Sequence, residues 1–220
     1  MPGLFHTSVE LSPVSFTVGS VTCTKISVGP MDNNAYLLDA GGPLVLIDAA
    51  DDAQRLLTLI AGRPVAAVVT THQHHDHVQA LAEVVHATGA QAWAGAPDVA
   101  AIADQTGIES TPVWSGEQIE TAAIKLEVIG LVGHTPGSIT LVLHPDAEGV
   151  PVHLFTGDSL FPGGVGATRS PSQFTSLLDD VTREIFDRFD DQTVVHPGHG
   201  DSTTLGDQRG QLSEWRARGW

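Results

Sequence analysis

The chain has 220 residues and a formal net charge of −16, with 26 Asp and Glu against 10 Lys and Arg. A surface of this sign repels phosphate backbones, which argues against a nucleic-acid partner. No apolar run approaches the roughly 18 residues that a transmembrane helix needs, so we expect no membrane insertion. The single cysteine, Cys23, excludes an internal disulfide, and the N-terminus lacks a basic stretch followed by an apolar one, so we expect a cytoplasmic protein.

The first half of the sequence alternates short strands with helices. Alternating or continuous apolar residues predict strands at 21–28, 35–40, 44–47 and 65–71. Apolar residues at helical spacing predict one helix over 52–61, which Gly62 ends, and a second from Val78 to about Gly89. Cys23 alternates with its neighbours in the first strand, where we expect a small buried side chain.

The second half repeats this alternation. Apolar runs predict strands at 124–131, 139–144, 152–156 and 193–195, and a short polar helix at the end of the chain. The clearest helix lies at 171–189, where Ser170 is a good N-cap, Pro171 suits the first helical position and Gln173 completes a capping box. No low-complexity tract or charged linker divides the sequence. We therefore expect one domain over residues 1–220, with two sheets packed face to face and helices outside.

Four histidines and one aspartate occupy positions 72 to 77 in the stretch 70-TTHQHHDHVQAL-81. On a helix, His72 and His74 would point about 200° apart, whereas in an extended segment both imidazoles lie on one side. An amphipathic run begins directly after His77. The stretch therefore predicts the end of a strand, a loop that carries metal ligands, and the first turn of a helix.

Three further motifs follow candidate strands: 133-GHTPGS-138, 156-TGDSLF-161 and 196-HPGHGD-201. Each sets a His or Asp beside Gly or Pro at a strand end, where a rigid sheet can hold a metal site. With the first cluster, the candidate metal ligands are His72, His74, Asp76, His77, His134, Asp158 and His199. This mixture of imidazoles and carboxylates suits two divalent ions, most simply zinc, with iron or manganese as alternatives.

The four motifs, in this order, resemble the ligand set of the metallo-β-lactamase fold, and their wording is closest to its glyoxalase II-like branch. The resemblance covers roughly residues 20–205. It implies an α+β fold: an αββα sandwich of two mixed β-sheets flanked by helices, with the site at one edge of the sheets. It also implies that one metal takes His72, His74 and His134, the other takes Asp76, His77 and His199, and Asp158 bridges them. The family counterpart of Asp48 orients the ligands, although a helix-cap or turn role for Asp48 is equally open.

The expected chemistry is hydrolysis of a small-molecule substrate. A water between two divalent ions loses a proton near neutral pH, which supplies hydroxide without a protein base. The resemblance implies an ester-type carbonyl bond, with a thioester preferred, and makes Asp76, His77 and Asp158 the catalytic residues. Glyoxalase II proper carries a C-terminal helical extension that grips glutathione, whereas only 62 residues follow Asp158 here. The thiol is therefore left open, and a lactone or a simple ester stays an alternative.

The loop 161–170 follows Asp158 and should border the mouth of the site, so we predict that Phe161 and Arg169 contact the substrate, Arg169 by pairing with a carboxylate. We predict His75 as a wall of the site and His196 as a structural residue. Other functions stay open, namely a β-lactamase-like hydrolase, a non-catalytic metal-binding protein, and a persulfide dioxygenase. The dioxygenase uses one iron, which His72, His134 and Asp158 would hold. The sequence does not indicate an oligomeric state.

Overall fold

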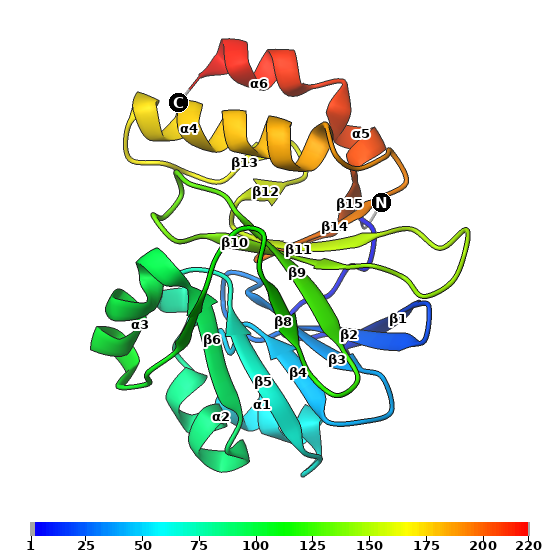
Figure 1. The fold of residues 1–220 in the computed structure, drawn as a ribbon, viewed down its shortest axis with the longest axis vertical. Helices are drawn as coiled ribbons and strands as arrows, with labels where there is room; N and C mark the ends of the chain where they lie inside the picture. The colour runs from blue at the N-terminus through cyan, green and yellow to red at the C-terminus, as the bar shows by residue number, and fades with distance from the viewer. Residues whose placement is uncertain (1–2, 220) are drawn as a thin grey trace.

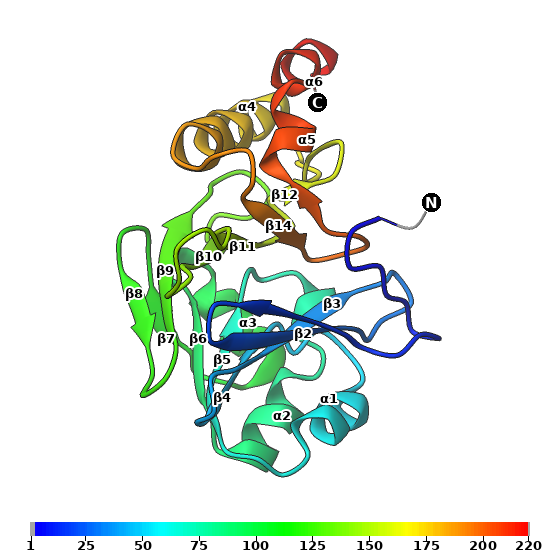
Figure 2. The same ribbon diagram turned by 90° about the vertical axis from the view of Figure 1, so that its right-hand side faces the viewer.

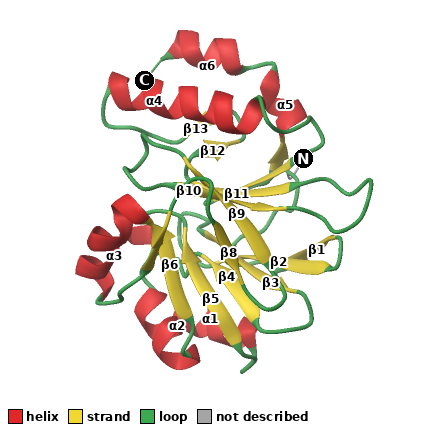
Figure 3. Cartoon of the chain, in the orientation of Figure 1, coloured by secondary structure: helices red, strands yellow, loops and turns green. Residues whose placement is uncertain are grey.

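The structure, a computed structural model, describes residues 3–219. Two mixed β-sheets lie face to face, and helices cover the outer face of each sheet, so that the molecule has four layers (Figure 1). Coloured by element type, the helices lie at the two outer sides and the strands between them (Figure 3). The predicted αββα sandwich is confirmed. None of the helices within residues 3–219 has the length and apolar character needed to cross a bilayer.

The first sheet has seven strands that follow one another in chain order. They are β1 (Val14–Val18), β2 (Val21–Ser27), β3 (Asn34–Asp39), β4 (Leu44–Ile47), β5 (Val65–Thr70), β6 (Gln91–Gly95) and β7 (Thr111–Val113). Neighbours from β1 to β4 are antiparallel, and neighbours from β4 to β7 are parallel. The parallel crossovers carry α1 (Ala53–Ile60), α2 (Leu81–Thr88) and, after the short η2 (Ala96–Asp98), α3 (Val99–Thr106), which cover the outer face of this sheet (Figure 2).

The second sheet has six strands in the order β15-β14-β11-β10-β9-β8. These are β8 (Gln118–Glu120), β9 (Lys125–Gly130), β10 (Ile139–Leu143), β11 (His153–Gly157), β14 (Val194–Pro197) and β15 (Thr203–Thr204). A short hairpin, β12 (Leu160–Phe161) and β13 (Gly164–Val165), follows β11. On the outer side lie α4 (Pro171–Asp180), its π-helical continuation η3 (Val181–Phe186), α5 (Leu205–Arg209) and α6 (Leu212–Arg218).

The central core lies between the two sheets and takes side chains from both. Its fully buried members include Cys23 and Leu38 from the first sheet and Val128, Leu141 and Phe155 from the second. Burying this continuous apolar layer is the main favourable term that holds the sheets together. The burial of Cys23 agrees with its position in the alternating pattern of β2.

Most predicted elements are present, but three details differ. The helix predicted over 171–189 is α-helical only to Asp180, and the next turns are π-helical, with the Asp187 N–H donating to the Thr182 carbonyl. The cap that ends α1 is Ala61, at φ 54°, one residue before Gly62. Sequence patterns did not predict the unit β6–α3–β7 (91–113) or the strands β1, β8, β12, β13 and β15. These strands have only two to five residues, and β6 is rich in Ala and Gly rather than β-branched residues.

Candidate metal centre

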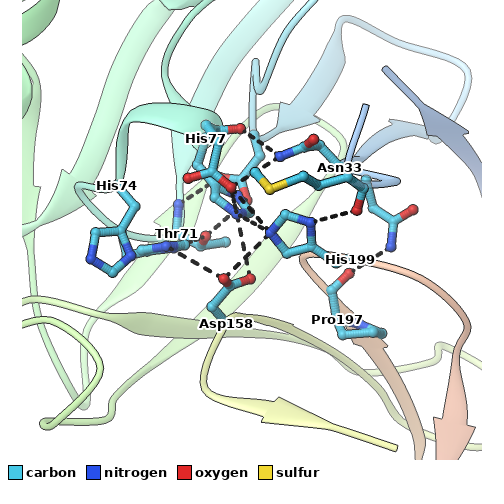
Figure 4. A network of polar contacts seen from close by, with 12 residues as sticks. Asn33, Thr71, His74, His77, Asp158, Pro197 and His199 are labelled. Atoms are coloured by element: carbon cyan, nitrogen blue, oxygen red, sulfur yellow. Dashed lines mark hydrogen bonds and ion pairs between the residues drawn. The ribbon is translucent and has the colours of Figure 1, made fainter. Parts of the chain in front are cut away.

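The seven candidate ligands come from four loops that follow strands. The loop after β5 supplies positions 72–77, the β9–β10 connection supplies His134, and the loops after β11 and β14 supply Asp158 and His199. The structure brings all seven side chains together. Figure 4 shows four of them, His74, His77, Asp158 and His199, at this place. The seven side chains form three overlapping sets in which the ligand atoms lie within 4.8 Å of one another. The first group is His72, His74 and His134, and the second group is Asp76, His77 and His199. The remaining set, His72, His77 and Asp158, joins these two groups.

The first histidine group consists of His72, His74 and His134. The His74 Nδ1 atom lies 2.8 Å from His134 Nε2. His134 Nδ1 donates to the Ala167 carbonyl at 2.7 Å, which places the proton of a neutral ring there and leaves the Nε2 lone pair facing the group. His72 Nε2 is buried and has no hydrogen-bond partner among the described residues. A buried nitrogen of this kind is costly unless a cation binds it.

The second group consists of Asp76, His77 and His199. The His199 Nε2 atom lies 3.2 Å from Asp76 Oδ2 and 3.2 Å from His77 Nε2. Each ring is fixed from behind: His77 Nδ1 donates to Asp48 Oδ2 at 2.9 Å, and His199 Nδ1 donates to the Met31 carbonyl at 3.0 Å. Both Nε2 atoms therefore face the centre of the group, as in metal-binding histidines whose other nitrogen donates to an oxygen.

Asp158 lies between the two groups. Its Oδ1 is 3.4 Å from His77 Nε2, and its Oδ2 is 3.4 Å from His199 Nε2 and 3.6 Å from His134 Nε2. The carboxylate thus approaches imidazoles of both groups, and its Oδ1 is buried without a full hydrogen bond from the described residues.

The electrostatics of the cluster favour a bound cation. Burial and the neighbouring His77 imidazole lower the pKa of His72 well below its ordinary value, so this ring is neutral. Burial also lowers the pKa of His77, but hydrogen bonds with Asp158 and Asp48 outweigh it and raise the pKa to about 10. Burial raises the pKa of Asp158, but the His199 and His77 imidazoles, each 3.4 Å away, outweigh it and hold the pKa well below its usual range. A divalent cation would replace the proton that these groups share.

The residues present therefore fit metal ions. The donor set contains imidazoles and carboxylates, the ligand nitrogens converge, and two buried ligand atoms have no full hydrogen bond among the described residues. We conclude that this His and Asp cluster is capable of binding metal ions.

Asp48 holds the first ligand loop, which decides between its two predicted roles. Its Oδ1 accepts from the Thr71 N–H at 2.7 Å, and its Oδ2 accepts from the Thr71 hydroxyl at 2.8 Å as well as from His77. The cap of the following helix is Asp52, whose side chain accepts from the Arg55 N–H. Asp48 therefore orients His77 and the residue before His72, and it does not cap a helix.

The three residues predicted to contact the substrate differ in how close they lie to the metal-ligand cluster. The Phe161 ring lies 6.4 Å from the His199 ring, measured between centroids. Arg169 is exposed, and its backbone N–H donates to the Gln173 side chain. The exposed His75 belongs to η1 (His75–His77) and lines a separate hollow of about 150 Å³ with Val78, Gln79, Ala82, Gln105 and Thr106. Substrate contact by these residues stays a prediction.

The sequence predicted the structural role of His196 but did not indicate three polar residues that hold the ligand loops. His196 was predicted to be structural, and it is buried, with its ring stacked on those of Phe16 and Phe155. Asn33, Asn34 and Asp98 were not singled out, although all are buried and bond to ligand loops. The one signal available for the two asparagines was the polar run 31-MDNN-34 between two strands.

Comparison with known proteins identifies the family. The profile described as "Metallo-beta-lactamase superfamily" matches residues 28–199. The chain belongs to the metallo-β-lactamase superfamily. It is an enzyme of this superfamily and is similar to its glyoxalase II-like members.

Three relatives show the extent of the similarity. A hydroxyacylglutathione hydrolase of Anaeromyxobacter dehalogenans is 34% identical over 169 residues, which are 76% of this chain and 61% of that protein, so the chain spans about three fifths of this relative. Hydroxyacylglutathione hydrolase GloC of Haemophilus influenzae is 26% identical over 224 residues, which cover 92% of this chain and 95% of that protein. The solved structure of TTHA1623 in a di-iron-bound form is 31% identical, with a TM-score of 0.65 and coverage of 90% of this chain and 97% of that one.

Proposed function

We propose that the protein is a dinuclear metal-dependent hydrolase of a thioester, with a hydroxyacyl-thiol as its substrate class. The observation that carries this proposal is the place of Asp158, whose carboxylate lies 3.4 to 3.6 Å from imidazole nitrogens of both ligand groups. His72, His74 and His134 would hold one ion, and Asp76, His77 and His199 would hold the other. Asp158 would serve both. Zinc is the preferred metal, and iron or manganese are alternatives.

Two divalent ions, when bound there, would supply hydroxide near neutral pH and would polarise the carbonyl under attack. The protein's own groups prepare this chemistry. Burial raises the pKa of Asp158, but the nearby His199 and His77 imidazoles outweigh it, so the carboxylate stays ionised beside both groups. Asp76 would accept a hydrogen bond from the attacking water in addition to its ligand role. His77 is held by Asp48, so its Nε2 atom keeps a constant direction.

The names of the relatives support the choice of a thioester. Two of them are hydroxyacylglutathione hydrolases, and the one from Haemophilus influenzae matches this chain over nearly its whole length. The thiol itself is left open, with another thioester, a lactone or a simple ester as alternatives to the glutathione ester. Phe161 and Arg169 are the proposed substrate contacts, and His75 a proposed wall.

Elemental analysis tests the metal part of this proposal. We expect about two equivalents of divalent metal per chain in protein purified without chelator or added metal, as the two ligand groups require. One equivalent of iron and an empty second group would contradict it and favour a persulfide dioxygenase.

A substrate panel tests the reaction. We expect faster hydrolysis of hydroxyacyl thioesters than of the matched oxygen esters and lactones. Asp158→Asn should abolish this activity, whereas Asp104→Asn, at an exposed position of α3, is the matched control and should not change it. Two equivalents of metal with no turnover of any ester in the panel would contradict the hydrolase assignment.

A further inference from the structure

Two buried polar side chains outside the ligand cluster hold its loops. Asp98 follows β6 and is fully buried, and Asn33 precedes β3 and is 1% exposed. Neither belongs to the ligand groups. Each contacts ligands, or neighbours of ligands, of one group. Both touch the loop 72–77, Asp98 at Gln73 and Asn33 at Asp76, and each then bonds to one further ligand loop that the other does not touch.

Asp98 connects the two loops that supply the first group. Its Oδ2 accepts from the Gln73 N–H at 2.9 Å, and Gln73 lies between the ligands His72 and His74. The same oxygen accepts from the Thr135 hydroxyl at 2.6 Å, directly after His134, and Oδ1 accepts from the Gly137 N–H at 2.7 Å. One carboxylate therefore sets the distance between the His72–His74 segment and the His134 loop.

Asn33 connects the two loops that supply the second group. Its Nδ2 donates to the Asp76 carbonyl at 3.0 Å and to Asp76 Oδ2 at 3.1 Å. This Oδ2 is the oxygen that lies 3.2 Å from His199 Nε2. The Asn33 backbone also forms a β-bridge with His199. Asn33 therefore orients one ligand carboxylate while it holds the loop of a second ligand.

The neighbours of Asn33 complete this contact. Asn34 Nδ2 donates to the Pro197 carbonyl at 3.0 Å and to the Gly200 carbonyl at 2.9 Å, and its N–H donates to Gly198 at 2.7 Å. The loop around His199 is thus bound along its length by the polar run 31–34.

We infer that Asp98 and Asn33 are positioning residues that act separately, Asp98 on the metal site of His72, His74 and His134, and Asn33 on the site of Asp76, His77 and His199. This inference rests on the proposed function, which supplies the two ions. Loss of a partner that orients metal ligands commonly costs about 10- to 100-fold in metal affinity. If the two residues only supported the fold, each substitution would weaken both sites alike.

The test is a Zn²⁺ titration of metal-free protein against a competing chelator, which resolves two binding steps in the wild type. His134→Ala and His199→Ala identify which step belongs to which group. We expect Asp98→Asn to weaken the step that His134→Ala removes, and Asn33→Ala to weaken the step that His199→Ala removes, each by about 10- to 100-fold. The other step in each variant should keep its wild-type affinity, so each variant is the control for the other.

Folding is monitored by the thermal midpoint of the metal-free proteins. If Asp98→Asn does not fold, Thr135→Val removes one of the same hydrogen bonds without touching the carboxylate and should weaken the same step. Equal weakening of both steps by either variant, or no change in either step, would overturn the inference. If the wild type binds a single ion, the dinuclear proposal fails. The inference is still tested, because the affinity for that ion must then fall in one of the two variants and stay unchanged in the other.

Discussion

Replacing Asp48 by Asn tests how a ligand histidine is kept in its binding state. The carboxylate accepts hydrogen bonds from the Thr71 N–H at 2.7 Å, the Thr71 hydroxyl at 2.8 Å and His77 Nδ1 at 2.9 Å. An amide oxygen at the Oδ1 position still accepts from the Thr71 N–H. Its NH₂ group then faces His77 Nδ1, which must accept instead of donate. A neutral His77 therefore carries its proton on Nε2, the nitrogen that faces Asp158 and His199.

The size of this effect can be worked out in two ways. The hydrogen bond between the Asp48 carboxylate and His77 is shielded from solvent, since 3% of the Asp48 side chain and 0% of the His77 side chain are exposed. Hydrogen bonds to charged groups contribute about 1.5 to 3 kcal/mol. Independently, loss of such an orienting partner lowers metal affinity about 10- to 100-fold, which corresponds to about 1.4 to 2.8 kcal/mol. Both estimates give a loss near 2 kcal/mol, and we expect it in the binding step that His199→Ala also removes.

Chelator competition with Zn²⁺ measures this loss, and kcat/KM on the best substrate measures its consequence. Asp52→Asn is the matched control, because its Oδ1 accepts only from the Arg55 N–H at the start of α1, which an amide oxygen can also do. Unchanged zinc affinity in a folded Asp48→Asn protein would show that Asp48 does not set which nitrogen of His77 carries the proton.

Three further outcomes are expected. Removing the metal with a chelator should lower the thermal midpoint, because an ion that binds only the folded chain stabilises it by about 2.7 kcal/mol at 100 times its Kd; an unchanged midpoint would mean that the cluster holds no ion. Leu141→Ala, fully buried between the sheets, should cost about 2 to 5 kcal/mol in urea unfolding while zinc stoichiometry stays the same; lost zinc would show that the core and the site are coupled. Burial lowers the pKa of His153 from 6.5 to about 4, so between these pH values the unfolded chain binds a proton that the folded chain does not. Stability should therefore fall as pH falls through this range, by up to about 3 kcal/mol, and His153→Phe in metal-free protein should lose that part of the pH slope; equal slopes would contradict the assignment.

The ligand cluster illustrates what local sequence can predict. The apolar stretch of β5 followed by closely spaced histidines predicted a strand that leads into a ligand loop, and the structure has β5 ending at Thr70 with η1 and α2 behind the loop. The four motifs together predicted which side chains would converge, and the structure brings them within 4.8 Å of one another in three overlapping sets. In each motif the ligand residue and the glycines or prolines beside it lie within a few positions of one another. A short stretch of sequence is therefore enough to recognise the motif.

Most strands and helices could be predicted from the amino-acid sequence, because burial on one face gives apolar residues a regular spacing along a segment. The candidate ligands could be predicted from their short motifs. Tertiary structure alone decided how those ligands are held. Asn33 meets Asp76 across 43 positions, and Asp98 meets Thr135 across 37. The same is true of Asp48, for which the sequence left two roles open until its carboxylate was seen to bond to His77 and Thr71. A polar residue that bonds to a distant loop leaves no period in its own segment, so its partner is known only once the strands are placed side by side.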